Sequence, residues 1–163
     1  MSRERGFTLL ELMVTMVLLG LLAVTVSLVL PDSARQRLET DAQRLRTQLG
    51  LAMEQAIYRN ADYGLWVGGD DYRFFRRAGE TWIDPAPDSR LAPLALDRAT
   101  RLQLRVNGQS IAPVADHTPQ VLLLSDGQVS EFELTLSAAG VDAQPAITAS
   151  FAGDLRLRDR SQP

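Results

Sequence analysis

The first pattern along the chain is an apolar run from Phe7 to Leu30 that contains one carboxylate near its start, Glu11. A helix of this run would be roughly 36 Å long, enough to cross a hydrocarbon core about 30 Å thick. Arg3 and Arg5 precede it, so the positive-inside tendency predicts a cytoplasmic amino terminus and places the rest of the chain across the membrane. An ordinary signal-anchor helix fits the run but leaves Glu11 unexplained, because an acid within a span is costly.

A second pattern, from Asp32 to Arg59, has apolar residues at three- and four-residue spacing, which predicts an amphipathic helix. Its apolar stripe contains many alanines, which favours close packing on a β-sheet of the same chain; a coiled-coil partner is the alternative. The stripe consists of Ala34, Leu38, Ala42, Leu45, Leu49, Ala52 and Ala56, and the polar residues expected away from it are Arg37, Asp41, Arg44, Arg46 and Gln48.

After Asn60, apolar and polar residues alternate over short segments, which predicts strands with one apolar and one wet face. The fold class predicted is α+β, with a long amino-terminal helix packed on antiparallel sheet. The proline-rich segment Asp84–Ala99 is expected to be a loop. Strands are expected at residues 63–67, 72–76, 81–83, 100–106, 110–114, 120–124, 129–136, 147–151 and 155–158, with turns at 68–71, 84–89, 107–108, 126–127 and 153–154.

Composition narrows the function classes. A formal charge of -3 over 163 residues argues against a general nucleic-acid binder, which needs a basic face. The absence of cysteine excludes disulfide scaffolds, cysteine-ligated metals and thiol nucleophiles.

The segment "RGFTLLELMVTMVLLGLL" (Arg5–Leu22) resembles the class III signal of type IV pilins and of type II secretion pseudopilins. The resemblance implies that a prepilin peptidase cleaves between Gly6 and Phe7 and methylates Phe7. It implies that Glu11 pairs with the amino-terminal ammonium of a neighbouring subunit, so that two charges costly alone in the bilayer neutralise each other. It also suggests that the helix loosens between Gly20 and Pro31; a packing glycine and a boundary proline are the plain alternative.

The resemblance divides the chain into a leader (1–6), a transmembrane and filament-core helix (7–30), an amphipathic helix (31–59) and a periplasmic β-rich domain (60–163), together a pilin-like fold. Size and the expected hairpin at "SDGQVSEFELTLS" (Ser125–Ser137) most resemble an H-type minor pseudopilin. The implied partners are other minor and major pseudopilins, the prepilin peptidase and the inner-membrane secretion platform. The implied location is first the bacterial inner membrane, which the chain crosses once. The chain is then expected near the tip of a periplasmic pseudopilus, a filament that helps move folded proteins across the outer membrane.

Few residues outside the amino-terminal segment suggest chemistry. His117 is the only histidine and is expected in a loop, and Asp70 and Asp71 favour a turn over a calcium site. We expect no catalytic residue, cofactor or metal site, because no recognised catalytic motif is present.

Arg156, Arg158 and Arg160 alternate near the carboxy terminus and are expected on one face of a strand. This face is expected to be solvated or paired with Glu131 and Glu133; a polyanion site is the alternative. A polyanion site would fit a second possible function, that of a type IV minor pilin that binds DNA. The lack of cysteine favours the secretion function over this one. A third function, an enzyme held by a signal anchor, has no motif to support it.

Overall fold

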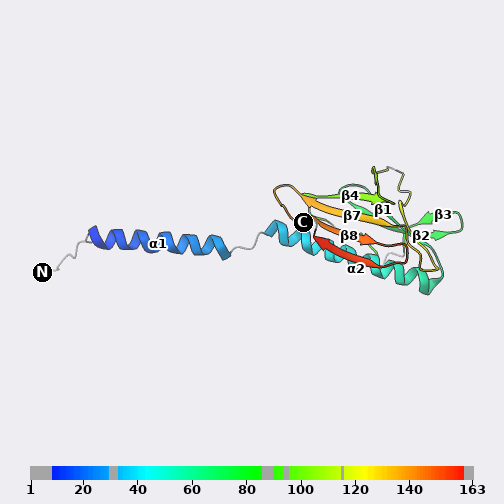
Figure 1. The fold of residues 1–163 in the computed structure, drawn as a ribbon, viewed down its shortest axis with the longest axis horizontal. Helices are drawn as coiled ribbons and strands as arrows, with labels where there is room; N and C mark the ends of the chain where they lie inside the picture. Colours follow the sequence, from blue (N-terminus) through cyan, green and yellow to red (C-terminus); the bar gives the residue numbers. More distant parts are fainter. Residues whose placement is uncertain (1–8, 30–32, 86–89, 94–95, 115, 160–163) are drawn as a thin grey trace. The chain divides into compact units, whose positions relative to one another are not determined.

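The computed structural model describes residues 9–29, 33–85, 90–93, 96–114 and 116–159. The chain divides into two compact units, Met1–Ser33 and Ala34–Pro163, and each is considered by itself. Helices come first along the chain and strands follow (Figure 1). This is the α+β organisation that the sequence predicts.

The described part of the first unit is a helix, α1 (Leu9–Val29), which confirms that the apolar run is helical. Its large apolar side chains between Leu9 and Leu19 are exposed. Within the described residues, no helix has both the length and the hydropathy expected of a membrane-spanning helix. The predicted span 7–30 begins and ends outside the described residues and stays a prediction.

The second unit is organised around α2 (Ser33–Arg59). Six stripe residues are at most 1% exposed: Leu38, Ala42, Leu45, Leu49, Ala52 and Ala56. Ala34, predicted on the stripe, is exposed, whereas Asp41 and Gln48, predicted away from it, are buried. The helix ends at Arg59, and the next residue, Asn60, has a φ of 48°, the left-handed conformation that asparagine tolerates after a helix.

Four strands form sheet A, in the order β3-β2-β1-β6, with every neighbouring pair antiparallel. They are β1 (Tyr63–Val67), β2 (Tyr72–Ala78), β3 (Thr81–Ile83) and β6 (Val121–Leu123). Leu65 lies opposite Phe74 and Val121 on the face that packs into the core.

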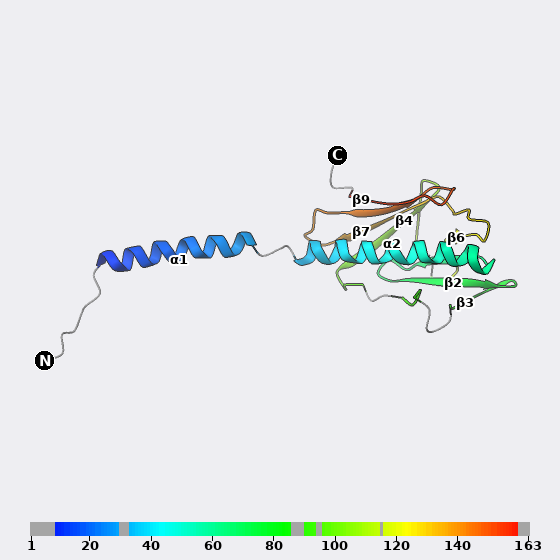
Figure 2. The ribbon, with the colours of Figure 1, turned by 90° about the horizontal axis from the view of Figure 1, so that it is seen from below.

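Five strands form sheet B, in the order β5-β4-β7-β8-β9, again antiparallel throughout. They are β4 (Thr100–Val106), β5 (Gln109–Ile111), β7 (Phe132–Ala138), β8 (Pro145–Ala149) and β9 (Leu155–Asp159). Leu104, Leu134 and Ile147 share one buried row and join the α2 stripe in a single core. Figure 2 shows β2 and β3 on one side of α2 and β7 and β9 on the other.

Two of the predicted turns show how far the local sequence pattern predicts strand pairing. Asn107 and Gly108 both have positive φ, 50° and 78°, as a two-residue type I′ hairpin requires, and they join β4 to β5 as predicted. The hairpin predicted at Ser125–Ser137 forms only beside its turn. Its Asp126–Gly127 turn closes only a short ladder at Leu123 and Val129, after which the chain passes from sheet A to sheet B.

Candidate functional site: the amino-terminal helix and the polar surfaces of the globular unit

The residues predicted for processing and assembly lie on or before α1. Gly6, Phe7 and Pro31 are outside the described residues, as is Arg160 at the other end of the chain. Glu11 is in the first turn of α1, and its side chain is exposed. Gly20 lies within unbroken helix, with open space where a Cβ would stand, so the proposed loosening remains a prediction.

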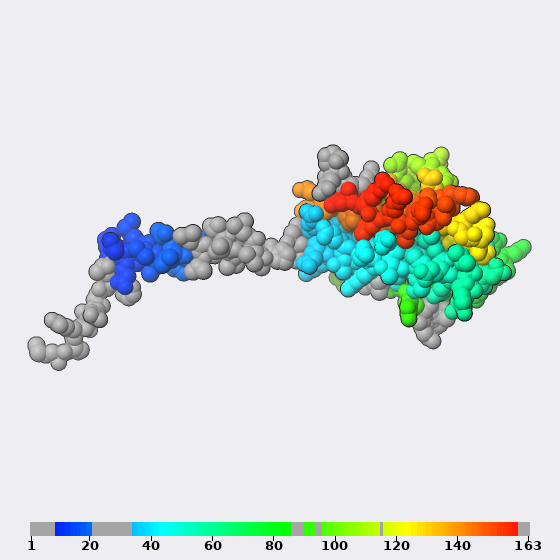
Figure 3. Space-filling model, turned by 60° about the horizontal axis from the view of Figure 1, so that its bottom comes forward, coloured from blue at the N-terminus to red at the C-terminus, as the bar shows by residue number. Residues whose placement is uncertain are grey.

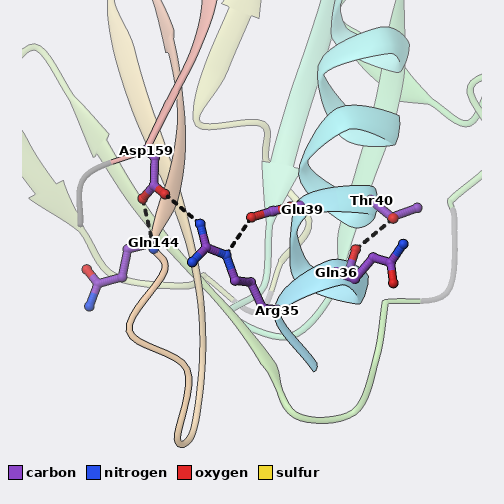
Figure 4. A network of polar contacts seen from close by, with 6 residues as sticks. All are labelled: Arg35, Gln36, Glu39, Thr40, Gln144 and Asp159. Carbon is purple, nitrogen blue, oxygen red and sulfur yellow. Dashed lines mark hydrogen bonds and ion pairs between the residues drawn. The ribbon is translucent and has the colours of Figure 1, made fainter. Parts of the chain in front are cut away.

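The start of α2 is fastened to the carboxy-terminal strand by a polar network (Figure 4). Arg35 donates through Nε to Glu39, one turn along the helix, at 2.8 Å, and its Nη2 lies 3.8 Å from a carboxylate oxygen of Asp159 at the end of β9. Asp159 also accepts from the backbone amide of Gln144 at 3.4 Å. These groups are partly solvated, so each ion pair contributes little stability and the network mainly fixes position.

A second polar contact holds the same part of α2 to the segment that leads into β4. Arg37 lies 3.4 Å from Asp97, and the backbone amide of Asp97 donates to Asp41 at 3.4 Å. The hydrogen bond from the Ala99 amide, aided by Arg37, lowers the pKa of Asp97 below its ordinary 3.8. The buried Asp41 therefore has a positional role that the helical pattern did not predict.

The buried side chain of Gln48, on α2, bonds with groups from two other parts of the unit. Its amide nitrogen donates to the carbonyls of Arg90 and Ala92, at 3.0 and 2.9 Å, and its amide oxygen accepts from the Tyr72 hydroxyl at 2.7 Å. Gln48 thereby ties the segment before β4 to the helix and to sheet A. The available sequence signal is its spacing from the stripe, three residues after Leu45 and four before Ala52.

The outer face of sheet A carries an aromatic cluster that sequence reasoning missed. His117, in the predicted loop, packs on Trp66 with ring centroids 4.6 Å apart, and Trp66 donates its indole hydrogen bond to the carbonyl of Val114. Gly64 lies beneath the same loop, where a Cβ would run into Pro119. The loop therefore covers this face, which explains why β1 is buried on both sides.

Asp70 and Asp71 form the turn between β1 and β2, which is closed by the bond from the Gly68 amide to the Asp71 carbonyl. No group of three or more histidine or carboxylate side chains that could hold a metal ion occurs among the residues described. Hydrogen bonds from the backbone amide and the side chain of Thr118 lower the pKa of Asp116 beside His117. These are local turn interactions.

The two described members of the arginine stripe, Arg156 and Arg158, are exposed on β9, and Leu155 and Leu157 are turned to the half-buried side. The strand order separates them from the glutamates considered as partners, because β8 lies between β9 and β7. Glu133 has Arg105 and Thr148 as its neighbours in register, and Arg156 faces Thr148. Arg156 and Glu133 are therefore not directly opposite each other, and the expectation of a solvated or paired arginine face stays a prediction.

Two parts of the chain match known families. Residues 1–27 match the prokaryotic N-terminal methylation motif. Residues 41–153, which include most of α2 and all strands up to β8, match the family of the type II transport protein GspH.

The chain belongs to the GspH family. The expected resemblance to an H-type minor pseudopilin is confirmed. Related curated proteins include type II secretion system protein H of Pseudomonas aeruginosa, 31% identical over 88% of this chain and 89% of that protein. Protein H of Escherichia coli K12 is 31% identical over 96% and 94% of the two chains.

Solved structures of GspH-family proteins have the same fold. The minor pseudopilin EpsH of Vibrio cholerae has a TM-score of 0.64 at 25% identity and covers 74% of this chain and 94% of its own. The solution structure of Escherichia coli GspH has a TM-score of 0.64 at 21% identity, over 83% and 98% of the two chains. The type IV minor pilin FimU of Pseudomonas aeruginosa, with a TM-score of 0.56 at 15% identity, shares the fold alone.

Proposed function

We propose that this GspH-family chain is a minor subunit of a periplasmic pseudopilus, placed near its tip, in a type II system that moves folded proteins across the outer membrane. The observation that carries the proposal is the presence, in one chain, of a methylation motif at residues 1–27 and a GspH region at residues 41–153. The methylation motif is the signal for processing and assembly, and the GspH region is the globular unit found in type II secretion proteins. Its partners are other minor and major pseudopilins and the inner-membrane secretion platform.

The chain first enters the inner membrane through residues 7–30, with residues 1–6 in the cytoplasm and residues 60–163 in the periplasm. Prepilin peptidase removes the leader after Gly6 and methylates Phe7. The chain is then drawn from the membrane into the pseudopilus, where the same helix becomes part of the filament core. The charge of Arg3 and Arg5 before the apolar run supports this orientation.

Glu11 sets the position of the subunit during assembly. It pairs with the ammonium of a neighbouring Phe7, since an uncompensated charge in the lipid would be costly. Gly20 and Pro31 bound the part of the helix that loosens in the filament, because glycine weakens a helix and proline interrupts it.

Replacement of Glu11 tests this proposal in cells. Glu11→Ala should leave membrane insertion intact but abolish most cross-linking to partner pseudopilins and most secretion, because removing one member of a buried charge pair costs about 3–5 kcal/mol. Thr15→Ala, one helical turn further on, is the matched control and should behave as the wild type. Normal cross-linking and secretion in the Glu11→Ala strain would defeat the proposed pairing.

The alternative function, a DNA-binding type IV minor pilin, is favoured by one observation, the exposure of Arg156 and Arg158. The relatives at 31% identity are secretion proteins, whereas the type IV pilin FimU is similar only in fold. Salt-dependent DNA binding that is lost in Arg156→Gln/Arg158→Gln would favour the pilin function.

A further inference from the structure

The outer face of sheet B collects four arginines that are far apart in the sequence. Arg101 and Arg105 project from β4, and Arg156 and Arg158 from β9. Between them, β7 and β8 contribute short side chains, of which Thr135 and Ala146 are buried and Thr148 is half-buried. β4 and β9 are separated by three strand spacings of about 4.8 Å. The arginine pair on β4 therefore lies about 14 Å from the pair on β9. We call these four residues the arginine face.

The register fixes the rows across this face. Arg105, Glu133, Thr148 and Arg156 form one row, and Gln103, Thr135, Ala146 and Arg158 form the next. A shallow cleft of about 210 Å³ opens beside Arg105 and is lined also by Glu131, Glu133 and Thr148. The face therefore has a hollow at the end near the β4–β5 turn and arginines along both sides.

The charge of the arginine face differs from that of the chain. Four arginines lie on the outer surface of the described strands of sheet B, in a protein whose formal charge is -3. The acids near them are Glu131 and Glu133 beside Arg105, and Asp154 and Asp159 at the two ends of β9. Within the described part of the chain, no hydrogen bond or ion pair occupies the side chains of Arg156 and Arg158. The surface of β9 lies open beside α2 (Figure 3).

The spacing of the arginines suits an extended acidic polypeptide. Arg156 and Arg158 are two residues apart on one strand, roughly 7 Å, which is also the spacing of alternate side chains in an extended peptide. Guanidinium groups bind carboxylates with two parallel hydrogen bonds, so consecutive acids on one side of such a segment can each engage an arginine.

Two features of the arginine face disfavour a nucleic acid. The outward residues of β4, β7, β8 and β9 include no aromatic side chain on which a base could stack. Glu131 and Glu133 beside Arg105 would repel a phosphate backbone, whereas a peptide has neutral positions to place opposite them.

We propose that the arginine face binds an extended acidic segment of another protein, with carboxylates on Arg156 and Arg158. The interaction belongs to the globular unit and does not depend on cleavage after Gly6 or on Glu11. It goes beyond the proposed function because it assigns a surface and the chemistry of its partner. Failure of this surface to bind would leave the assembly of α1 unaffected.

The test uses the full chain in detergent and a short fluorescein-labelled peptide of alternating Glu and Thr, whose anisotropy reports binding. We expect saturable binding that weakens about tenfold in Arg156→Gln/Arg158→Gln, since the variant loses both exposed charge pairs with the peptide. Arg59→Gln/Arg73→Gln, with the same change in charge away from sheet B, should bind as the wild type. A Gln-Thr peptide should not bind.

Charge reversal separates recognition from misfolding. The double variant Arg156→Glu/Arg158→Glu should no longer bind the Glu-Thr peptide and should bind a Lys-Thr peptide instead. Its tryptophan fluorescence should remain that of the wild type. The proposal is overturned if the Glu-Thr peptide does not bind the wild type, or if the two Arg→Gln double variants weaken its binding equally. It is also overturned if the charge-reversal variant does not prefer the Lys-Thr peptide. It is also overturned if a single-stranded DNA oligonucleotide binds this face more tightly than the peptide.

Discussion

Gln48 shows how a single polar residue organises the globular unit. It is on a helix, is only 7% exposed, and bonds with a hydroxyl of sheet A and with two carbonyls of the segment before β4. The helical pattern could place it next to the stripe but could not identify its partners, because Arg90 and Ala92 are in a segment without regular structure. Long-range polar pairing of this kind requires the fold.

Gln48→Leu should therefore lower the free energy of unfolding by about 2 kcal/mol, because three hydrogen bonds of the Gln48 amide are lost while the side-chain volume is nearly kept. Both tryptophans are in the globular unit, so their fluorescence in urea follows this unfolding. Gln43→Leu, at an exposed position of the same helix, should change stability little. An equal effect of the two substitutions would show that Gln48 has no special role.

Asp97 gives the globular unit a stability that depends on pH. Its folded pKa is held below 3.8 by the Ala99 amide, with Arg37 contributing. Because the folded pKa is depressed, this contribution is full above the unfolded pKa and is lost as pH falls through the folded value. Wild type should therefore be more stable than Asp97→Asn above about pH 4, and the gap should close below it.

Urea midpoints measured over this pH range provide the check. Asp70→Asn, in the exposed turn between β1 and β2, is the matched control and should differ little from wild type. A gap between wild type and Asp97→Asn that widened on acidification would contradict the assigned sign.

Helices and strands were largely predictable because each has its own periodicity. The stripe of α2 predicted six of its fully buried residues, and alternation at Leu102, Leu104 and Val106 predicted β4 with its bounds. Pairing was less predictable: the turn at Asp126–Gly127 was recognised, but local sequence does not specify that the flanking strands belong to different sheets.

Two glycines in these elements should respond oppositely to the same change. Gly50→Ala should stabilise by about 0.5–1 kcal/mol, because Gly50 is inside α2 and a Cβ there meets no atom within 4 Å. Gly64→Ala should destabilise by about 1–3 kcal/mol, because its Cβ would displace Pro119 and the loop over sheet A. Thermal unfolding of both variants measures this contrast, and the same sign for both would refute it.

At the scale of the whole molecule, function is divided between two units that the sequence signals in different ways. The processing residues were identified through a dense motif, and no described contact of Gly6 or Phe7 could have identified them. The arginine face required the structure instead, because only the order of strands in sheet B shows that β4 and β9 contribute to one face, with β7 and β8 between them. Sequence thus predicted the fold class and the family and left the surface chemistry to tertiary structure.

The central claim is that the chain becomes a pseudopilus subunit after processing at Gly6. Top-down mass spectrometry of the protein extracted from membranes of cells with an active secretion system tests it most directly. The mass should correspond to a chain that begins at Phe7 and carries one methyl group on its amino terminus. A chain that retains Met1 and has an unmethylated Phe7 would contradict the account.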